Sequence, residues 1–181
     1  MQRFYSFILF KILGWRKIGE SPKDIKKYVL TGLPHTSNWD FLYGWLAAQA
    51  LGLETKIFVK DAYFFWPLNY VCKWLGLLPV NRRKSTNFVD TMAEKFEEHE
   101  ELHLFIAPEG TRKRVERLKS GYYHLARKAG VPIVVAGPNY EQKTYTIMTP
   151  REPLDSFEDD QQQIIDFAKK QVGRIPSNSF Q

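Results

Sequence analysis

A histidine and an aspartate five residues apart, His35 and Asp40, form the first pair of side chains that could do acid–base chemistry. They follow an apolar run, Tyr28-Val29-Leu30, and a proline-containing turn, and the stretch from Trp39 to Leu51 has the pattern of a helix. This order predicts that His35 lies in the turn after a strand, at the edge of a sheet, and that Asp40 lies in the first helical turn. A carboxylate beside one imidazole nitrogen fixes the tautomer and leaves the other nitrogen free as a base. The alternative is a structural turn in which the two side chains bond without chemistry.

A second polar loop follows another apolar run, Leu102 to Ala107, which has the pattern of a buried strand. Its sequence is Pro108-Glu109-Gly110-Thr111-Arg112-Lys113-Arg114. Gly110 lets backbone N–H groups approach a ligand, Thr111 offers a hydroxyl, and Arg112 offers a two-pronged guanidinium. The loop is therefore a candidate anion site, although a solvated basic loop would have the same composition.

Residues 99–103 match the H-E-x-x-H pattern of helical zinc proteases. That site needs both histidines on one helical face and a third ligand further along the chain. Here Leu102 begins a predicted strand, so His99 and His103 would straddle a helix–strand junction, and His124 is the one histidine that follows. We therefore expect no metal site.

The net charge of +6 favours an anionic partner, which could be nucleic acid, phospholipid headgroups or a phosphorylated metabolite. The basic run from Arg112 to Lys119 could serve nucleic-acid binding together with stacking aromatic rings. The aromatic residues, however, lie within apolar runs and not among the basic residues. We therefore expect no nucleic-acid partner.

The first 20 residues predict a helix lying at a membrane interface. Their apolar run, from Phe4 to Phe10, is interrupted by a lysine and is too short to span a bilayer. Cations border its aromatic and aliphatic residues, a pattern typical of interfacial helices: Arg3, Lys11, Arg16 and Lys17. No signal-peptide cleavage site follows it. A helix packed on the domain's own core is the alternative. A second aromatic segment, residues 63–67, could be a substrate wall, a membrane contact or part of the core.

The remaining pattern predicts one α/β domain over residues 1–181, with a mostly parallel sheet flanked by helices. The chain has 181 residues, of which 44% are hydrophobic, enough for one sizeable core. Its one cysteine, Cys72, excludes an intramolecular disulfide and suits a reducing compartment. Short apolar runs predict strands at 28–30, 56–60, 77–80, 102–107, 133–136 and 144–148, and helical patterns cover 39–51, 68–75, 86–98, 122–129 and 157–172.

The two polar loops and two further segments together resemble the glycerolipid acyltransferase family, the 1-acylglycerol-3-phosphate acyltransferases and their relatives. Residues 35–40 match the family's H-x-x-x-x-D, and residues 109–112 match its E-G-T-R. Gly76, with Arg82 six residues later, is similar to another family block, and Val131-Pro132-Ile133-Val134 to a fourth. The four blocks occur in this order and at predicted strand ends, which makes the match to the family specific. The resemblance covers most of the chain.

The resemblance implies transfer of a fatty acyl group from acyl-CoA or acyl-carrier protein to the hydroxyl of a lysophospholipid, 1-acylglycerol-3-phosphate above all, in phospholipid biosynthesis. It implies that His35 removes the hydroxyl proton and that Asp40 orients the imidazole. Arg112 and Lys60 would hold the acceptor's phosphate, and Arg82 would add to the cationic wall. The other expected substrate-binding residues order and shape the loop: Glu109, Gly110 and Thr111.

The same resemblance implies no metal and no cofactor beyond the thioester co-substrate. The expected partners are the acyl donor, the lysophospholipid and a membrane surface, with the protein peripheral at the cytoplasmic face of the cell membrane. The alternatives are a catalytically inactive lipid-binding or membrane-surface protein and an acyltransferase with another acceptor.

Overall fold

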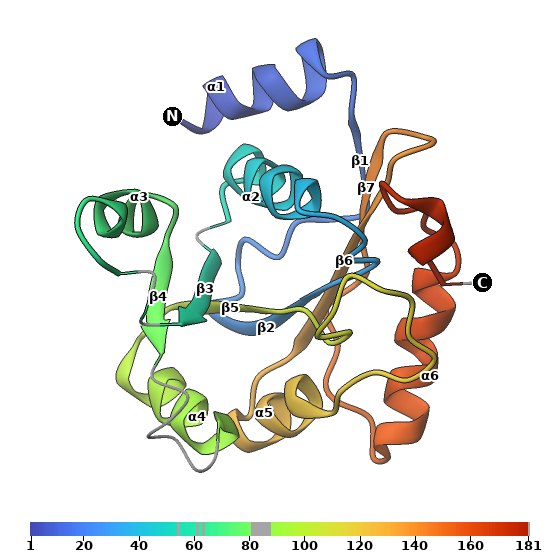
Figure 1. The fold of residues 1–181 in the computed structure, drawn as a ribbon. Helices are drawn as coiled ribbons and strands as arrows, with labels where there is room; N and C mark the ends of the chain where they lie inside the picture. Colours follow the sequence, from blue (N-terminus) through green and yellow to red (C-terminus); the bar gives the residue numbers. More distant parts are fainter. Residues whose placement is uncertain (54, 61, 63, 81–87, 181) are drawn as a thin grey trace.

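The computed structural model describes residues 1–53, 55–60, 62, 64–80 and 88–180. Within them, seven strands form one sheet in the order β1-β7-β6-β2-β5-β3-β4 (Figure 1). The strands are β1 (Arg16–Ile18), β2 (Lys27–Gly32), β3 (Thr55–Lys60), β4 (Leu77–Val80), β5 (Leu102–Ile106), β6 (Ile133–Asn139) and β7 (Thr144–Ile147). The helices are α1 (Gln2–Ser6) with its π-helical continuation η1 (Phe7–Ile12), α2 (Trp39–Leu51), α3 (Leu68–Trp74), α4 (Phe88–Glu98), α5 (Gly121–Ala129), α6 (Phe157–Ala168) and the 3-10 turn η3 (Pro176–Asn178).

Strands β6, β2, β5, β3 and β4 run parallel, so their carboxyl ends meet at one edge of the sheet. Strand β7 pairs antiparallel with β6, and β1 pairs parallel with β7 at the far side. The expected α/β class with a mostly parallel sheet flanked by helices is confirmed. In open sheets of this kind, ligands bind outside the carboxyl ends of the strands.

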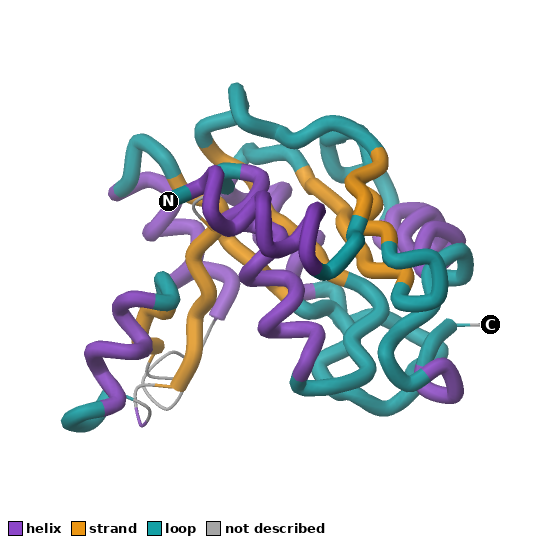
Figure 2. The backbone as a smooth tube through the Cα atoms, turned by 90° about the horizontal axis from the view of Figure 1, so that it is seen from above, coloured by secondary structure: helices purple, strands orange, loops and turns teal. Residues whose placement is uncertain are grey.

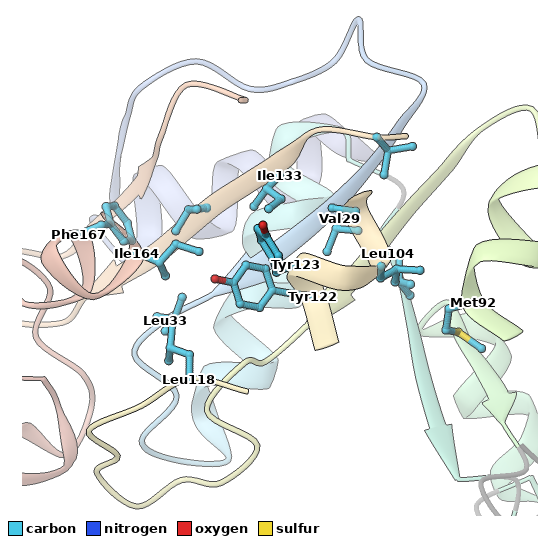
Figure 3. Close-up of a cluster of buried hydrophobic side chains, with 14 of the residues drawn as sticks. Val29, Leu33, Met92, Leu104, Leu118, Tyr122, Tyr123, Ile133, Ile164 and Phe167 are labelled. Carbon is cyan, nitrogen blue, oxygen red and sulfur yellow. The ribbon is translucent and has the colours of Figure 1, made fainter. Parts of the chain in front are cut away.

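Helices cover both faces of the sheet. The side chains of β2 alternate between these two faces, so each face contributes apolar residues to one of two buried clusters. Tyr28 and Leu30 pack towards α2, in a cluster that includes Ala48 and Leu51. Val29 packs into the larger cluster with α4, α5 and α6, shown in Figure 3. Both faces of the sheet are therefore packed against helices, which fixes where its carboxyl edge lies.

The N-terminal helix, α1 with η1, forms a further layer and lies across α2 (Figure 2). Its Leu9 is buried against Ala47 and Ala50 of α2, whereas Phe4 and Phe7 are exposed. This helix therefore packs on the core with one side, as the alternative interpretation required, and leaves aromatic residues on the other. None of the helices formed by the described residues is long and apolar enough to cross a membrane.

The structure differs from the sequence prediction at both ends of the chain. The N-terminal helix ends at Ile12, and Arg16 instead begins an edge strand, with its N–H bonded to the Lys143 carbonyl at 2.9 Å. Helix α6 ends at Ala168, four residues before the predicted end, and the chain beyond it pairs with another segment, since the Val172 carbonyl accepts a hydrogen bond from the Tyr140 N–H at 2.8 Å. Both differences come from tertiary pairing, which local periodicity does not report.

Candidate active site

The turn between β2 and α2 places His35 and Asp40 at the carboxyl edge of the sheet. Helix α2 begins at Trp39, as predicted, so Asp40 lies in its first turn. The preceding chain runs very close to β6: a Cβ added to Gly137 would lie 2.0 Å from the Leu33 carbonyl oxygen. Glycine at that position therefore lets the turn approach its neighbouring strand.

Asp40 is fixed by hydrogen bonds to both carboxylate oxygens. Its Oδ2 accepts from the backbone N–H groups of Thr36 at 2.6 Å and Ser37 at 2.7 Å. Its Oδ1 accepts from the Tyr140 hydroxyl at 2.7 Å, across 100 residues of sequence. A carboxylate with this many donors keeps one orientation and a dispersed negative charge.

His35 faces that carboxylate through Nδ1, which lies 3.7 Å from Asp40 Oδ2. The separation exceeds a hydrogen bond, as in many unliganded sites where catalytic bonds tighten only when substrate binds. Burial lowers the pKa of His35 below its ordinary 6.5, and Arg112 adds to that effect, while Asp40 opposes both. The imidazole is therefore neutral at neutral pH and can accept a proton.

Glu109 ties the loop after β5 to the histidine. Its Oε2 accepts a hydrogen bond from the His35 backbone N–H at 2.8 Å, and the residue is 3% exposed. Burial raises the pKa of this carboxyl to about 8, with the charge of Asp40 contributing and the His35 N–H opposing the rise. Glu109 is thus placed to hold the histidine turn and not to bind an exposed ligand.

Arg112 extends from the same loop towards the histidine turn, where its Nη1 donates to Asn38 Oδ1. Gly110 has a left-handed backbone with φ of +65°, and a Cβ there would meet Lys119 Nζ at 2.5 Å. The close approach that glycine permits is therefore to the Lys119 side chain. The hydroxyl of Thr111 accepts the Lys113 N–H at 3.3 Å within the loop.

Two cavities meet at His35. The larger, about 770 Å³, is lined on its polar side by His35, Thr111, Arg112 and Lys119 and elsewhere by apolar residues of β5 and the α4–α5 layer. The smaller, about 60 Å³, lies on the α2 side, and its lining is mostly apolar: Leu30, Phe41, Gly44, Trp45, Ala48, Phe105 and Tyr145, beside His35 and Asp40. The histidine is therefore shared by a cationic cavity and an apolar pocket.

For two other predicted site residues, Lys60 and Arg82, the structure does not describe the side chain. Lys60 ends β3, whose carboxyl end lies at the same edge of the sheet, but β5 separates β3 from the histidine's strand, so β3 does not flank it. Arg82 lies outside the described residues. The H-E-x-x-H pattern straddles an element boundary as expected, because α4 ends before His99 and His103 lies in β5.

Lys119 and Tyr140 are among the described residues at the site that the sequence did not predict. Lys119 belongs to the basic run that the sequence displays, but its contact with the Gly110 turn depends on the folded loop. Tyr140 lies between β6 and β7 and carries no motif, so only the fold brings its hydroxyl to Asp40.

The Tyr140 contact predicts a shift in the pH dependence of activity. Burial and the neighbouring Asp40 raise the pKa of this phenol, so it stays a hydrogen-bond donor. Tyr140→Phe would leave more negative charge on Asp40, which stabilises the imidazolium and raises the pKa of His35. We expect the acidic limb of the kcat/KM profile to move to higher pH by on the order of half a unit.

The matched control is Tyr43→Phe, because Tyr43 packs edge-on against the Tyr140 ring in the same aromatic cluster. An unshifted acidic limb in a folded Tyr140→Phe protein would show that this hydroxyl does not tune His35.

Known proteins that resemble this chain are acyltransferases, in agreement with the chemistry that the site could perform. The family model described as Acyltransferase matches residues 19–137. The fold is similar to the crystal structure of the 1-acyl-sn-glycerophosphate acyltransferase PlsC from Thermotoga maritima, with a TM-score of 0.64, 16% identity, and coverage of 93% of this chain and 76% of that one. A comparison with curated protein sequences found no match. With both polar loops inside the matched region, the chain belongs to the acyltransferase family.

Proposed function

We propose that this acyltransferase moves a fatty acyl group from a thioester donor to the hydroxyl of a lysophospholipid, with 1-acylglycerol-3-phosphate as the acceptor. The observation that carries the proposal is that His35 lines both an apolar pocket and a cationic cavity. A hydrocarbon chain suits the first, and a phosphorylated headgroup suits the second. The name of the Thermotoga maritima neighbour, a 1-acyl-sn-glycerophosphate acyltransferase, supports the same acceptor.

The proposed reaction needs one base and no metal. His35 Nε2 takes the proton of the acceptor hydroxyl as the oxygen attacks the thioester carbonyl. The carbon–sulfur bond then breaks, and the departing thiolate takes that proton, so an ester and a free thiol are formed. Asp40 lies beside Nδ1 and stabilises the imidazolium between these steps, as the carboxylate does in other acyl-transfer triads.

The apolar pocket is proposed to hold the first part of the acyl chain. Gly44 of α2 lines it, and a Cβ added there would meet the Tyr145 hydroxyl at 3.7 Å, an ordinary contact. We expect Gly44→Leu to fill the pocket and to lower kcat/KM for long acyl-CoA donors at least tenfold more than for short ones, as pocket filling does elsewhere.

Gly44→Ala is the graded control, since it adds one methyl group and should have a small effect on the same series. The measurement is kcat/KM across acyl-CoA donors of increasing length. An unchanged length profile in a folded Gly44→Leu protein would place the acyl chain elsewhere.

The thiol released from the donor tests the function itself. We expect free CoA thiol to appear when acyl-CoA and 1-acylglycerol-3-phosphate are both present, in one-to-one ratio with new ester. A protein that only binds lipid would release no thiol above background. Thiol release that is equal with and without acceptor would make the protein a thioesterase.

The remaining features concern location and donor. The aromatic residues exposed on the N-terminal helix, with Arg3 and Lys11 beside them, support a peripheral position at a membrane surface, which we propose is the cytoplasmic face of the cell membrane. Acyl-CoA and acyl-carrier protein both fit the reaction, because only the thioester takes part in the bond exchange. Comparing kcat/KM for the two donors would choose between them.

A further inference from the structure

The segment around α3 exposes an unusual set of large side chains. Phe65 is 57% exposed, Trp66 79%, Tyr70 66%, Val71 48% and Trp74 64%. We call these five residues the α3 patch. Residues of these types are usually buried, and exposed apolar surfaces of this kind mark interaction sites. The helix is anchored by its other side, since Cys72 is buried at 4% exposure.

The α3 patch is continuous with the N-terminal helix. The rings of Trp74 and Trp45 are 5.1 Å apart, Trp45 and Tyr5 are 5.4 Å apart, and Tyr5 and Phe4 are 5.7 Å apart. Trp45 belongs to α2, which in Figure 1 lies below the N-terminal helix and to the right of α3. A series of ring contacts through the half-buried Tyr5 and Trp45 therefore links the α3 patch to the exposed Phe4 of the N-terminal helix.

In the described segments that carry the α3 patch and the N-terminal helix, residues 64–80 and 1–19, the charged side chains are all basic. Residues 64–80 contain a single charged side chain, the exposed Lys73, and no acidic residue. Residues 1–19 contain Arg3, Lys11, Arg16 and Lys17, again with no acidic residue. In α2 the one acidic side chain, Asp40, is buried and hydrogen-bonded. An apolar aromatic surface bordered by cations complements an anionic lipid bilayer.

The position of this surface also suits lipid substrates. Trp45 joins the N-terminal helix to α3 and at the same time lines the apolar pocket that reaches His35. An acyl chain that leaves a bilayer at this surface would therefore meet the wall of the pocket.

We propose that the α3 patch is a second membrane-contact surface, which binds anionic bilayers together with the N-terminal helix. The inference rests on the proposed function in that both substrates are lipids drawn from the membrane. Trp and Tyr side chains of the patch lie at the headgroup level, and Lys73 contacts lipid phosphate.

The test uses the full chain and vesicles of phosphatidylcholine with or without phosphatidylglycerol. The variant is Trp66→Ser with Tyr70→Ser, two exposed residues outside the ring contacts described above, and the matched control is Ile175→Ser, an exposed aliphatic residue on the C-terminal segment. We expect the double variant to lose on the order of tenfold or more in partitioning to anionic vesicles, and the control to change little. Bromine on the lipid chains near the headgroup should quench tryptophan fluorescence of the wild type and less that of the variant.

An assay of acyl transfer between short-chain, water-soluble substrates tests the proposed function without a membrane, and so independently of the α3 patch. Transfer that persists in the double variant while vesicle binding falls supports the patch as a membrane contact. Transfer by the wild type with equal vesicle binding by the variant would overturn the inference and leave the function standing. Absence of transfer by the wild type would count against the function and not against the binding result.

Discussion

Replacing His35 with alanine is expected to lower the turnover number for acyl transfer by about a hundredfold or more. The loss follows from removing the base that lies between the two cavities, while the carboxylate of Asp40 keeps its backbone donors. Binding of vesicles and of acyl-CoA should be retained. The measurement is kcat with saturating donor and acceptor.

His124→Ala is the matched control, because His124 is an exposed histidine on α5 and should be dispensable. Near-normal turnover in a folded His35→Ala protein would assign the base to another residue and favour the lipid-binding alternative.

The pH dependence of the wild type follows from the same histidine. The imidazole must be neutral to accept a proton, so activity falls as pH decreases through its pKa. Burial lowers that pKa below 6.5, and Arg112 lowers it further against the opposing effect of Asp40. The acidic midpoint of kcat/KM should therefore lie below 6.5, and a midpoint well above it would contradict the assignment.

Replacing Arg112 with alanine is expected to reduce kcat/KM selectively for a phosphorylated acceptor. Arg112 and Lys119 line the cavity beside His35, so a phosphate held there would bring the neighbouring hydroxyl to the imidazole. Loss of a charge-assisted hydrogen bond costs about 1.5–3 kcal/mol of transition-state binding, on the order of 10- to 100-fold in kcat/KM. Arg112→Lys should also reduce activity, because lysine keeps the charge but not the planar fork.

Two comparisons separate substrate binding from a structural role of Arg112. The first is the same lipid without phosphate, on which Arg112→Ala should have little effect. The second is Asn38→Ala, which removes the acceptor of the Arg112 hydrogen bond and leaves the guanidinium in place. Equal losses on both acceptors, reproduced by Asn38→Ala, would mean that Arg112 supports the turn and not the phosphate.

Much of this fold was predictable because local pattern and tertiary structure agree. Helix α2 begins and ends at the predicted residues, since its apolar residues and the αL glycine after Leu51 give clear boundaries. Strands β2 and β5 were equally clear, and their adjacency brings the two polar loops together. The contact between Glu109 and the His35 backbone follows from that adjacency, although the sequence did not reveal its geometry.

The rest depended on contacts that no local pattern encodes. Strand β1 is three exposed residues long and exists through its pairing with β7. Tyr140 reaches Asp40 only because β6 places it beside the start of α2. Strand β5 lies between β3 and β2, so Lys60 at the end of β3 is not on a strand next to that of the histidine. Predicting this needs the strand order, which periodicity does not give.

The central claim is acyl transfer to a lysophospholipid hydroxyl, and the most direct measurement is the mass of the product. Purified protein would be incubated with isotopically labelled acyl-CoA and a panel of lysolipids that differ in headgroup. The panel would include the matching acceptor that lacks phosphate. We predict that the label appears in a diacyl product of 1-acylglycerol-3-phosphate, formed by the wild type and not by His35→Ala. Label found only in free fatty acid, or equal labelling by the two proteins, would contradict the account.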